Sequence, residues 1–242
     1  MATRQAILIG AAKVKPELPG VIVDVNDIKK FLLSNLGGAW KESEIVTLVD
    51  QPPAAVNRAL ETAKYKDYVF ITCSGHGEHQ VGKGLDETVM YLNEKETISI
   101  SSINPRNARH FLVVDVCRHI VKIEKETRRA IMDAFMESAA KGFIDYRKIF
   151  DDAIMACSEG RIVAYSCDIN QAAGDDGSGG IFTQELLKAP RDFSPKNTSS
   201  YGIVRLDKAF ERAQEMTYKK NAPQKPVLNA GRRQDFFPFA IV

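Results

Sequence analysis

Two apolar runs, each followed at once by a reactive polar motif, constrain the fold of this chain most strongly. Residues 68–73 precede Ser74-Gly75-His76-Gly77, and residues 111–114 precede Asp115-Val116-Cys117-Arg118. Both runs are short and rich in β-branched and aromatic residues, which is typical of buried parallel strands. Functional sites of open α/β sheets are built at the carboxyl ends of such strands. The sequence therefore predicts that a histidine and a cysteine, 41 positions apart, reach the same edge of one sheet.

The preceding segment alternates strands and helices. Strands are expected at 5–10, 44–49 and 67–73, separated by helices at 24–36 and 53–63. This β-α-β-α-β order is the signature of a parallel sheet with right-handed crossovers. We predict an α/β fold with helices on both faces of the sheet.

The remainder of the chain completes a single domain, 1–242, with about six mostly parallel strands. Residues 77–87 and 174–180 are expected to be loops, because they are rich in glycine and charge. Residues 119–160 are highly charged and are interpreted as an insertion or linker. The other expected elements are a hairpin (89–92 with 97–100), helices (101–108, 181–188, 203–219), strands (110–116, 161–166, 236–242) and an extended segment (222–228).

Composition excludes several classes of protein. The net charge of +2 gives no electrostatic basis for binding nucleic acid or an acidic membrane. No run approaches the roughly 18 apolar residues of a membrane span, and the start of the chain lacks a signal-peptide pattern. The four cysteines fit free thiols in a reducing compartment, so we expect a cytoplasmic protein.

The pairing of Ser-Gly-His-Gly with Asp-x-Cys resembles the caspase-like cysteine peptidases of clan CD, and within them the metacaspase-like branch. The Gln-Ala-Cys-x-Gly pattern of animal caspases is absent around Cys117, which argues against cleavage after aspartate. The resemblance implies a three-layer caspase-like sandwich over nearly the whole chain. Further landmarks occur in family order, at 7–10, 18–20, 26–27, 84–87, 164–166, 181–187 and 223–226.

Cys117 is the candidate nucleophile and His76 its proton shuttle. The resemblance implies that the backbone N–H groups of Gly77 and Cys117 form an oxyanion hole. Taken singly, Cys117 has the alternative role of a buried structural cysteine. The alternative for His76 is a loop histidine whose hydrogen bonds are satisfied. The polar frame of Cys117 and the glycines around His76 favour catalysis.

The resemblance also implies an acidic pocket for a basic side chain just before the cleaved bond. Asp27, Ser74 and Asp115 match pocket positions of the family, and Ser166 follows a family landmark. Asp24 stands where the family often has a cysteine, which adds a carboxylate. A helix cap for Asp24 and a solvated first-turn acid for Asp27 remain alternatives.

No cofactor and no metal are expected. Zinc ligation by Cys73, His76, His79, Cys117 and His119 is disfavoured because no familiar zinc spacing occurs, and His79 and His119 are interpreted as solvated loop residues. Asp86 matches one calcium position of the family, but Ser101-Ser102 replaces an acidic pair, so we expect no calcium requirement. Asp175 and Asp176 are interpreted as flexible surface.

The leading hypothesis is a cysteine endopeptidase that cleaves proteins or peptides after Arg or Lys. The alternatives are a caspase-like effector that a regulatory partner or small signalling molecule switches on, as in bacterial defence, and a non-catalytic caspase-like scaffold. Self-cleavage within 119–160, at Arg128, Arg129, Lys141 or Arg147, and no cleavage there are equally compatible with the sequence.

Overall fold

A six-stranded, mostly parallel sheet forms the centre of the computed structural model, which describes residues 1–82, 84–121, 145–193 and 201–242. The strand order is β11-β9-β7-β3-β1-β2, and only the edge strand β11 runs antiparallel to its neighbour. The predicted α/β class is confirmed. The strands are β1 (Arg4–Gly10), β2 (Ile45–Val49), β3 (Tyr68–Gly75), β7 (Arg109–Val116), β9 (Gly160–Tyr165) and β11 (Val227–Asn229).

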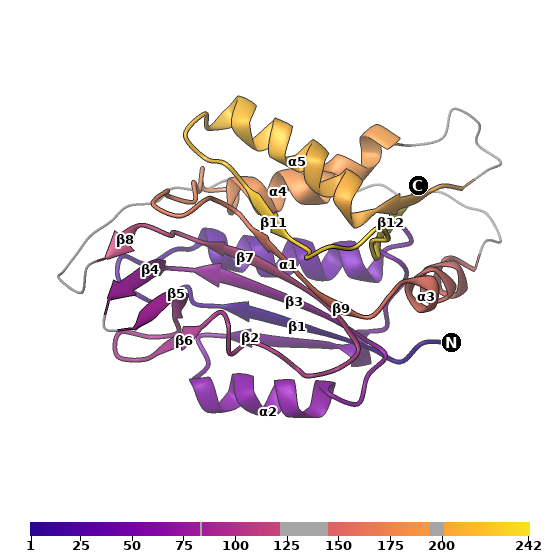
Figure 1. The fold of residues 1–242 in the computed structure, drawn as a ribbon, viewed down its shortest axis with the longest axis horizontal. Coiled ribbons are helices and arrows are strands. Elements are labelled where there is room, and N and C mark those ends of the chain that lie inside the picture. The colour runs from indigo at the N-terminus through magenta and orange to yellow at the C-terminus, as the bar shows by residue number, and fades with distance from the viewer. Residues whose placement is uncertain (83, 122–144, 194–200) are drawn as a thin grey trace.

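Helices cover both faces of this sheet (Figure 1). Helix α2 (Pro53–Ala63) lies on one face, and its first residues, Pro52 and Pro53, mark its start as predicted. The opposite face carries α1 (Gly20–Leu33), α3 (Tyr146–Ala156), α4 (Ile181–Lys188) and α5 (Leu206–Lys220). Two 3-10 turns, Glu42–Glu44 and Ala189–Phe193, complete the helical elements.

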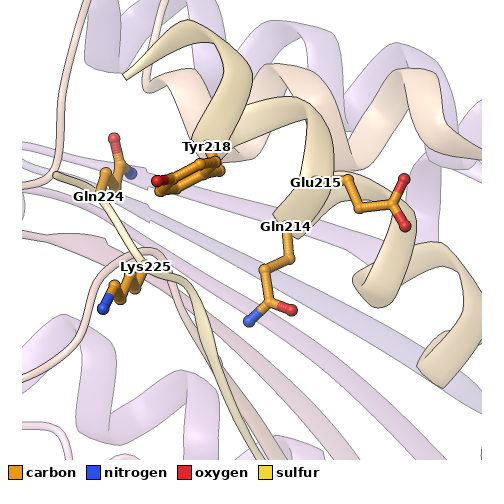
Figure 2. A pocket seen from close by; sticks show the side chains of 5 residues that line it. All are labelled: Gln214, Glu215, Tyr218, Gln224 and Lys225. Carbon is orange, nitrogen blue, oxygen red and sulfur yellow. The ribbon is translucent and has the colours of Figure 1, made fainter. Parts of the chain in front are cut away.

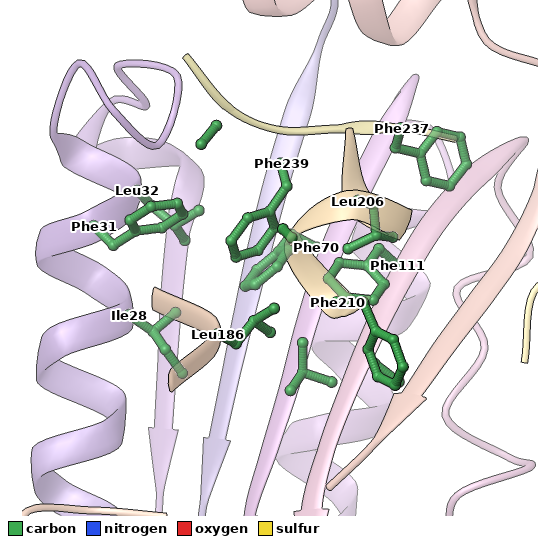
Figure 3. Packing of buried hydrophobic residues seen from close by; sticks show 14 of the residues in the cluster. Ile28, Phe31, Leu32, Phe70, Phe111, Leu186, Leu206, Phe210, Phe237 and Phe239 are labelled. Atoms are coloured by element: carbon green, nitrogen blue, oxygen red, sulfur yellow. The ribbon is translucent and has the colours of Figure 1, made fainter. Parts of the chain in front are cut away.

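The two faces of the sheet carry separate apolar cores. Alternation along β1 sends Leu8 to the α1 side and Ile7 to the α2 side. Figure 3 shows the larger core, in which aromatic rings from the sheet meet rings from the helical layer. Phe70 and Phe111 contact at 5.6 Å between centroids, and Phe31 stacks on Phe239 at 5.1 Å. Burial of these rings fixes α1 against the sheet.

A second, four-stranded sheet lies at the carboxyl ends of the central strands (Figure 1). Its strands are β4 (Gly77–Gly82), β5 (Leu85–Tyr91), β6 (Thr97–Ser99) and β8 (Ile120–Val121), in the order β6-β5-β4-β8. The loop predicted over 77–87 is therefore wrong. Its charged residues belong to paired strands, with Glu78 opposite Val89 and Gln80 opposite Glu87. The predicted pairing of 89–92 with 97–100 is confirmed.

Other expectations also need correction. Residues 101–108 form no helix, because Pro105 disfavours helical backbone at Asn104 and Arg106 has a φ of 57°. The final strand, β12 (Pro238–Ile241), pairs with β10 (Ile203–Arg205) rather than with the central sheet. The sixth central strand is β11, from the segment predicted only as extended.

The charged stretch 119–160 contains a core element. Its last third forms α3, whose Phe150 and Ile154 are buried in the larger core. Arg147 is no exposed cleavage site, because its guanidinium binds Glu44 at 2.5 and 2.8 Å. Arg128, Arg129 and Lys141 lie outside the described residues.

Candidate functional site

Strand register brings His76 and Cys117 to neighbouring strand ends. Strands β3 and β7 pair in parallel, with Ser74 opposite Asp115 and Gly75 opposite Val116. His76 and Cys117 are the next residue on each strand, so the two motifs leave the sheet side by side. Both residues are partly exposed, whereas the residues before them are buried.

A backbone carbonyl fixes the His76 ring. Its Nε2 lies 2.6 Å from the carbonyl oxygen of Pro16. Because a carbonyl only accepts, Nε2 carries a proton, and Nδ1 of the neutral ring is left with a lone pair. The hydrogen bond therefore fixes the orientation of the ring and, in its neutral form, leaves Nδ1 as the acceptor nitrogen.

Cys117 holds its thiol in a largely covered position. The thiol donates a weak hydrogen bond to the carbonyl oxygen of Ala173, with 3.8 Å from sulfur to oxygen. Burial first, and then the nearby Asp115 carboxyl, raise the pKa of the thiol. The sulfur is therefore protonated at rest, and any nucleophilic role needs a base that removes the proton during attack.

Gly77 begins β4, and only a glycine fits there. A Cβ atom at this position would lie 2.6 Å from Cγ2 of Val116 and 2.7 Å from the carbonyl oxygen of Val89. The absence of a side chain lets the main chain after His76 pack directly against the residue before Cys117.

Two buried carboxyl groups lie beneath these motifs. Asp24, inside α1 rather than at its cap, accepts hydrogen bonds from Ser74 Oγ at 2.7 Å and from the Gly180 N–H at 3.0 Å. Asp115 accepts from Thr183 through Oγ1 at 2.6 Å and through N at 3.2 Å. Ser74 thus contacts Asp24, and both carboxyl groups lie at the first residues of α4.

The environment of this pair opposes ionisation. Burial raises the pKa of Asp24 well above its usual range, and the Asp115 charge raises it further. Burial likewise raises the pKa of Asp115. The partly positive N-terminus of α4 points at both groups through the N–H of Gly180 and of Thr183. No lysine or arginine of the described residues pairs with either carboxyl group.

A third carboxyl group, that of Asp175, is half-buried, so the interpretation of this residue as flexible surface is wrong. Burial and the charges of Asp115 and Asp176 raise its pKa to about 6. Its carboxylate lies against the start of α1, since a Cβ at Gly20 would be 2.1 Å from Asp175 Oδ2. The sequence did not predict this position of Asp175, because a Gly-rich sequence predicts a mobile loop.

Of the other two predicted pocket residues, Asp27 lies at the margin, whereas the Ser166 side chain lies beside Asp115 and opposes the rise in the pKa of that carboxyl group. Asp27 is one turn further along α1, where Lys30 binds it at 3.1 Å and Gln184 Nε2 lies 3.5 Å away. Ser166 is fully buried at the end of β9, and its N–H donates to the carbonyl oxygen of Val114.

The loop 174–180 covers the acidic cluster, defined as Asp24, Asp115 and Asp175. A Cβ at Gly179 would lie 2.2 Å from Asp24 Oδ1, and one at Gly180 would lie 2.2 Å from Asp115 Oδ2. Gly179 also has a φ of 104°, which favours glycine. Two consecutive glycines therefore let the backbone rest directly on the carboxyl groups.

The candidate metal ligands are not brought together. In the part of the chain that is described, no three His, Cys, Asp or Glu side chains converge as a metal site requires. Cys73 is buried in β3, and His119 is exposed as predicted. His79 is not a solvated loop residue but is buried in β4, where its Nε2 lies 2.8 Å from Asp86 Oδ1.

An open groove lies between α5 and the segment before β11. Figure 2 shows its lining residues, Gln214, Glu215, Tyr218, Gln224 and Lys225. Gln224 connects it to the strand ends, because its Nε2 donates to the Ser166 carbonyl at 2.9 Å. No helix of the described residues is long and apolar enough to cross a membrane.

Comparisons with known proteins agree with this fold. The chain is similar to a Geobacter sulfurreducens protein of known structure, with 15% identity, a TM-score of 0.60 and coverage of 98% of this chain and 97% of the other. It is also similar to caspase-1 of Spodoptera frugiperda (11% identity, TM-score 0.58, coverage 95% and 86%). The Drosophila initiator caspase Dronc matches with 8% identity, a TM-score of 0.54 and coverage of 98% and 81%.

These structural similarities concern the fold alone, and no curated protein sequence matches the chain. The family model described as the caspase domain matches residues 3–237. The chain therefore belongs to the caspase domain family of cysteine peptidases.

Proposed function

We propose that this chain is a metacaspase-like cysteine endopeptidase, a single peptidase domain that cleaves after Arg or Lys with Cys117 and His76. The observation that carries the proposal is the register of β3 and β7, which makes these two residues neighbours at the carboxyl edge of the sheet. The hydrogen bond from His76 to Pro16 supports the role of the ring as a base.

The proposed reaction uses one proton shuttle. His76 Nδ1 takes the Cys117 proton as the sulfur attacks the scissile carbonyl carbon, and the backbone N–H groups of Gly77 and Cys117 stabilise the resulting oxyanion. The C–N bond breaks as His76 protonates the leaving amine. Water, deprotonated by His76, then hydrolyses the thioester, and the proton returns to the sulfur as the acid product leaves.

The acidic cluster supports the preference for a basic residue before the cleaved bond. Its three carboxyl groups are charged only at a cost, because burial and mutual repulsion raise their pKa values. A guanidinium or ammonium group among them would supply the missing positive charge, and an Arg side chain could bind two carboxylates at once.

A second candidate function is an enzyme that must be opened before it acts. The loop 174–180 lies directly on the cluster, and Ala173 contacts the thiol. A basic side chain reaches the carboxyl groups only if this loop moves. A regulatory partner or small signalling molecule that displaces the loop would then switch on the peptidase. A cytoplasmic location remains part of the proposal, since the four cysteines are free thiols.

The proposal is tested with matched fluorogenic peptides that end in Arg, Lys, citrulline or Asp, with and without a calcium chelator. Citrulline has the shape of Arg without its charge. We expect cleavage after Arg and Lys, none after citrulline, no effect of the chelator and complete loss in Cys117→Ala. Cleavage after Asp contradicts the acidic pocket. Activity that remains in Cys117→Ala contradicts the nucleophile, and activity only after a partner is added selects the switched enzyme.

A further inference from the structure

A chain of hydrogen bonds runs from the residue after Cys117 to the surface of the small sheet. Arg118 Nε donates to Thr88 Oγ1 at 3.0 Å, and Thr88 Oγ1 lies 3.1 Å from His79 Nδ1. His79 Nε2 in turn lies 2.8 Å from Asp86 Oδ1. Arg118, Thr88 and His79 are buried, whereas the Asp86 side chain is 81% exposed.

The direction of this chain follows from its donors and acceptors. A guanidinium group only donates, so Thr88 Oγ1 accepts from Arg118 and its own proton is free for His79 Nδ1. The Asp86 carboxylate only accepts, so His79 Nε2 carries a proton, and in the neutral form of the ring Nδ1 is the acceptor for the Thr88 hydroxyl. Every link therefore depends on the next, and the Asp86 carboxylate at the exposed end fixes the tautomer of His79.

Arg118 connects this chain to the segment that lies against the thiol. Its Nη1 donates to the Cys167 carbonyl at 3.1 Å, and its guanidinium lies 4.0 Å above the Tyr165 ring. The backbone of Arg118 also exchanges hydrogen bonds with Asn170 and Gln171. Cys117, whose thiol contacts Ala173, is thus held between the small sheet and residues 167–173.

The guanidinium is unusual in its surroundings. In the described part of the chain no carboxylate forms an ion pair with Arg118, although its side chain is buried. The partners of the guanidinium are neutral oxygens and an aromatic face. These contacts are directional, so they fix the position of the guanidinium group. An arginine kept only for stability would be expected to have an acidic partner.

We propose that Arg118 is a positioning residue for Cys117, and that the chain through Thr88 and His79 to Asp86 sets its position. The role in cleavage rests on the proposed peptidase function, whereas the position of the thiol does not. Hydroxyl loss at Thr88 leaves Arg118 Nε and His79 Nδ1 without their shared partner. The turn that carries the thiol and the Cys117 N–H then loses its fixed orientation relative to His76.

The test compares Thr88→Val, which removes only the hydroxyl, with Thr88→Ser, which retains it. The first readout is the rate at which iodoacetamide alkylates Cys117, followed by mass spectrometry of its peptide between pH 5 and 9. The second is kcat and KM for the Arg peptide. We expect Thr88→Val to lower kcat by about tenfold, with KM within about twofold, and to shift the pH profile of alkylation. Thr88→Ser is expected to restore both.

Asp86→Asn keeps the proposal testable if Thr88→Val fails to fold, because Asp86 is exposed. We expect this variant to shift the same alkylation profile by a smaller amount. Wild-type alkylation profiles in both Thr88→Val and Asp86→Asn would overturn the proposal, as would equal defects in Thr88→Val and Thr88→Ser. If wild-type protein cleaves no peptide, the peptidase function fails, and alkylation still decides whether the chain positions the thiol.

Discussion

The two ends of the central sheet both bury charged side chains, but among the described residues only the amino end pairs buried charges of opposite sign with one another. At that end, Arg4 Nε lies 3.2 Å from Asp151 Oδ1, and Arg147 binds Glu44. At the carboxyl end, Asp24, Asp115 and Asp175 gather without a lysine or arginine partner among the described residues. The same sheet thus carries one cluster whose opposite charges pair with one another and one whose carboxyl groups have no cationic partner among the described residues.

The amino-end cluster explains how α3 is attached. Arg4 begins β1 and packs 4.5 Å above the Trp40 ring, while Asp151 and Arg147 come from α3. Burial lowers the pKa of Arg4 to about 10, although the Asp151 charge opposes this. Burial alone would raise the pKa of Glu44, but the hydrogen bond from Arg147 lowers it. Opposite charges in this cluster therefore favour the ionised forms of one another, although burial still raises the pKa of Asp151.

The carboxyl-end cluster has the opposite property. Hydroxyl groups, an amide and the N-terminus of α4 satisfy its oxygens, but none of them supplies a full positive charge. The comparison teaches that buried charge in this fold is structural where it is paired within the chain. Where it is not, it points to a ligand of opposite charge.

The largest effect is expected from breaking the balanced cluster. Asp151→Asn removes the nearer of the two carboxylates beside the buried Arg4, so we expect the free energy of unfolding to fall by about 3–5 kcal/mol. Urea denaturation measures this loss. Activity per folded molecule at low temperature should stay near the wild-type value, because the cluster is remote from Cys117.

A matched control separates pairing from packing. The double variant Arg4→Met/Asp151→Leu removes both charges, and we expect it to regain most of the lost stability. If the double variant is as unstable as Asp151→Asn, the charges are not the reason for the loss.

Asp115→Asn, at the carboxyl end, should weaken peptidase activity while leaving stability almost unchanged. The amide keeps an oxygen for Thr183, so we expect stability within about 1 kcal/mol of wild type. Transition-state binding of an Arg peptide should weaken by about 2–5 kcal/mol, because one partner of a buried charge pair is gone. Peptidase assays and urea denaturation of the same preparation check both. Unchanged kcat/KM for Arg would show that the cluster does not bind the basic side chain.

The smallest effect is a pH dependence from Asp175. Its pKa of about 6 in the folded chain exceeds the ordinary value of 3.8, so the folded state binds the proton more tightly. Its contribution to the free energy of unfolding is therefore full below pH 3.8 and is lost as the pH rises through about 6. Over the same range the group becomes charged, so KM for an Arg peptide should fall. Asp175→Asn should flatten both profiles, and unchanged profiles in this variant would remove Asp175 from the cluster.

Local sequence patterns predicted the parts of the site that lie at strand ends. The runs before His76 and Cys117 identify buried parallel strands, and parallel strands end at one edge, so Ser74 and Asp115 had to be neighbours. The start of α2 at Pro53 was also predictable from the sequence, because proline favours the first turn of a helix.

Contacts between distant segments decided the rest. β11, not β12, completes the sheet, since both are short apolar segments and only packing assigns their partners. His79 is buried because β4 pairs with β5 and β8, and Asp175 joins the cluster because Gly179 and Gly180 lie on Asp24 and Asp115. The sequence by itself thus determined the parallel strands of the α/β fold and the edge that carries His76 and Cys117. The tertiary structure decided which charges are paired, because pairing depends on residues as far apart as Arg4 and Asp151.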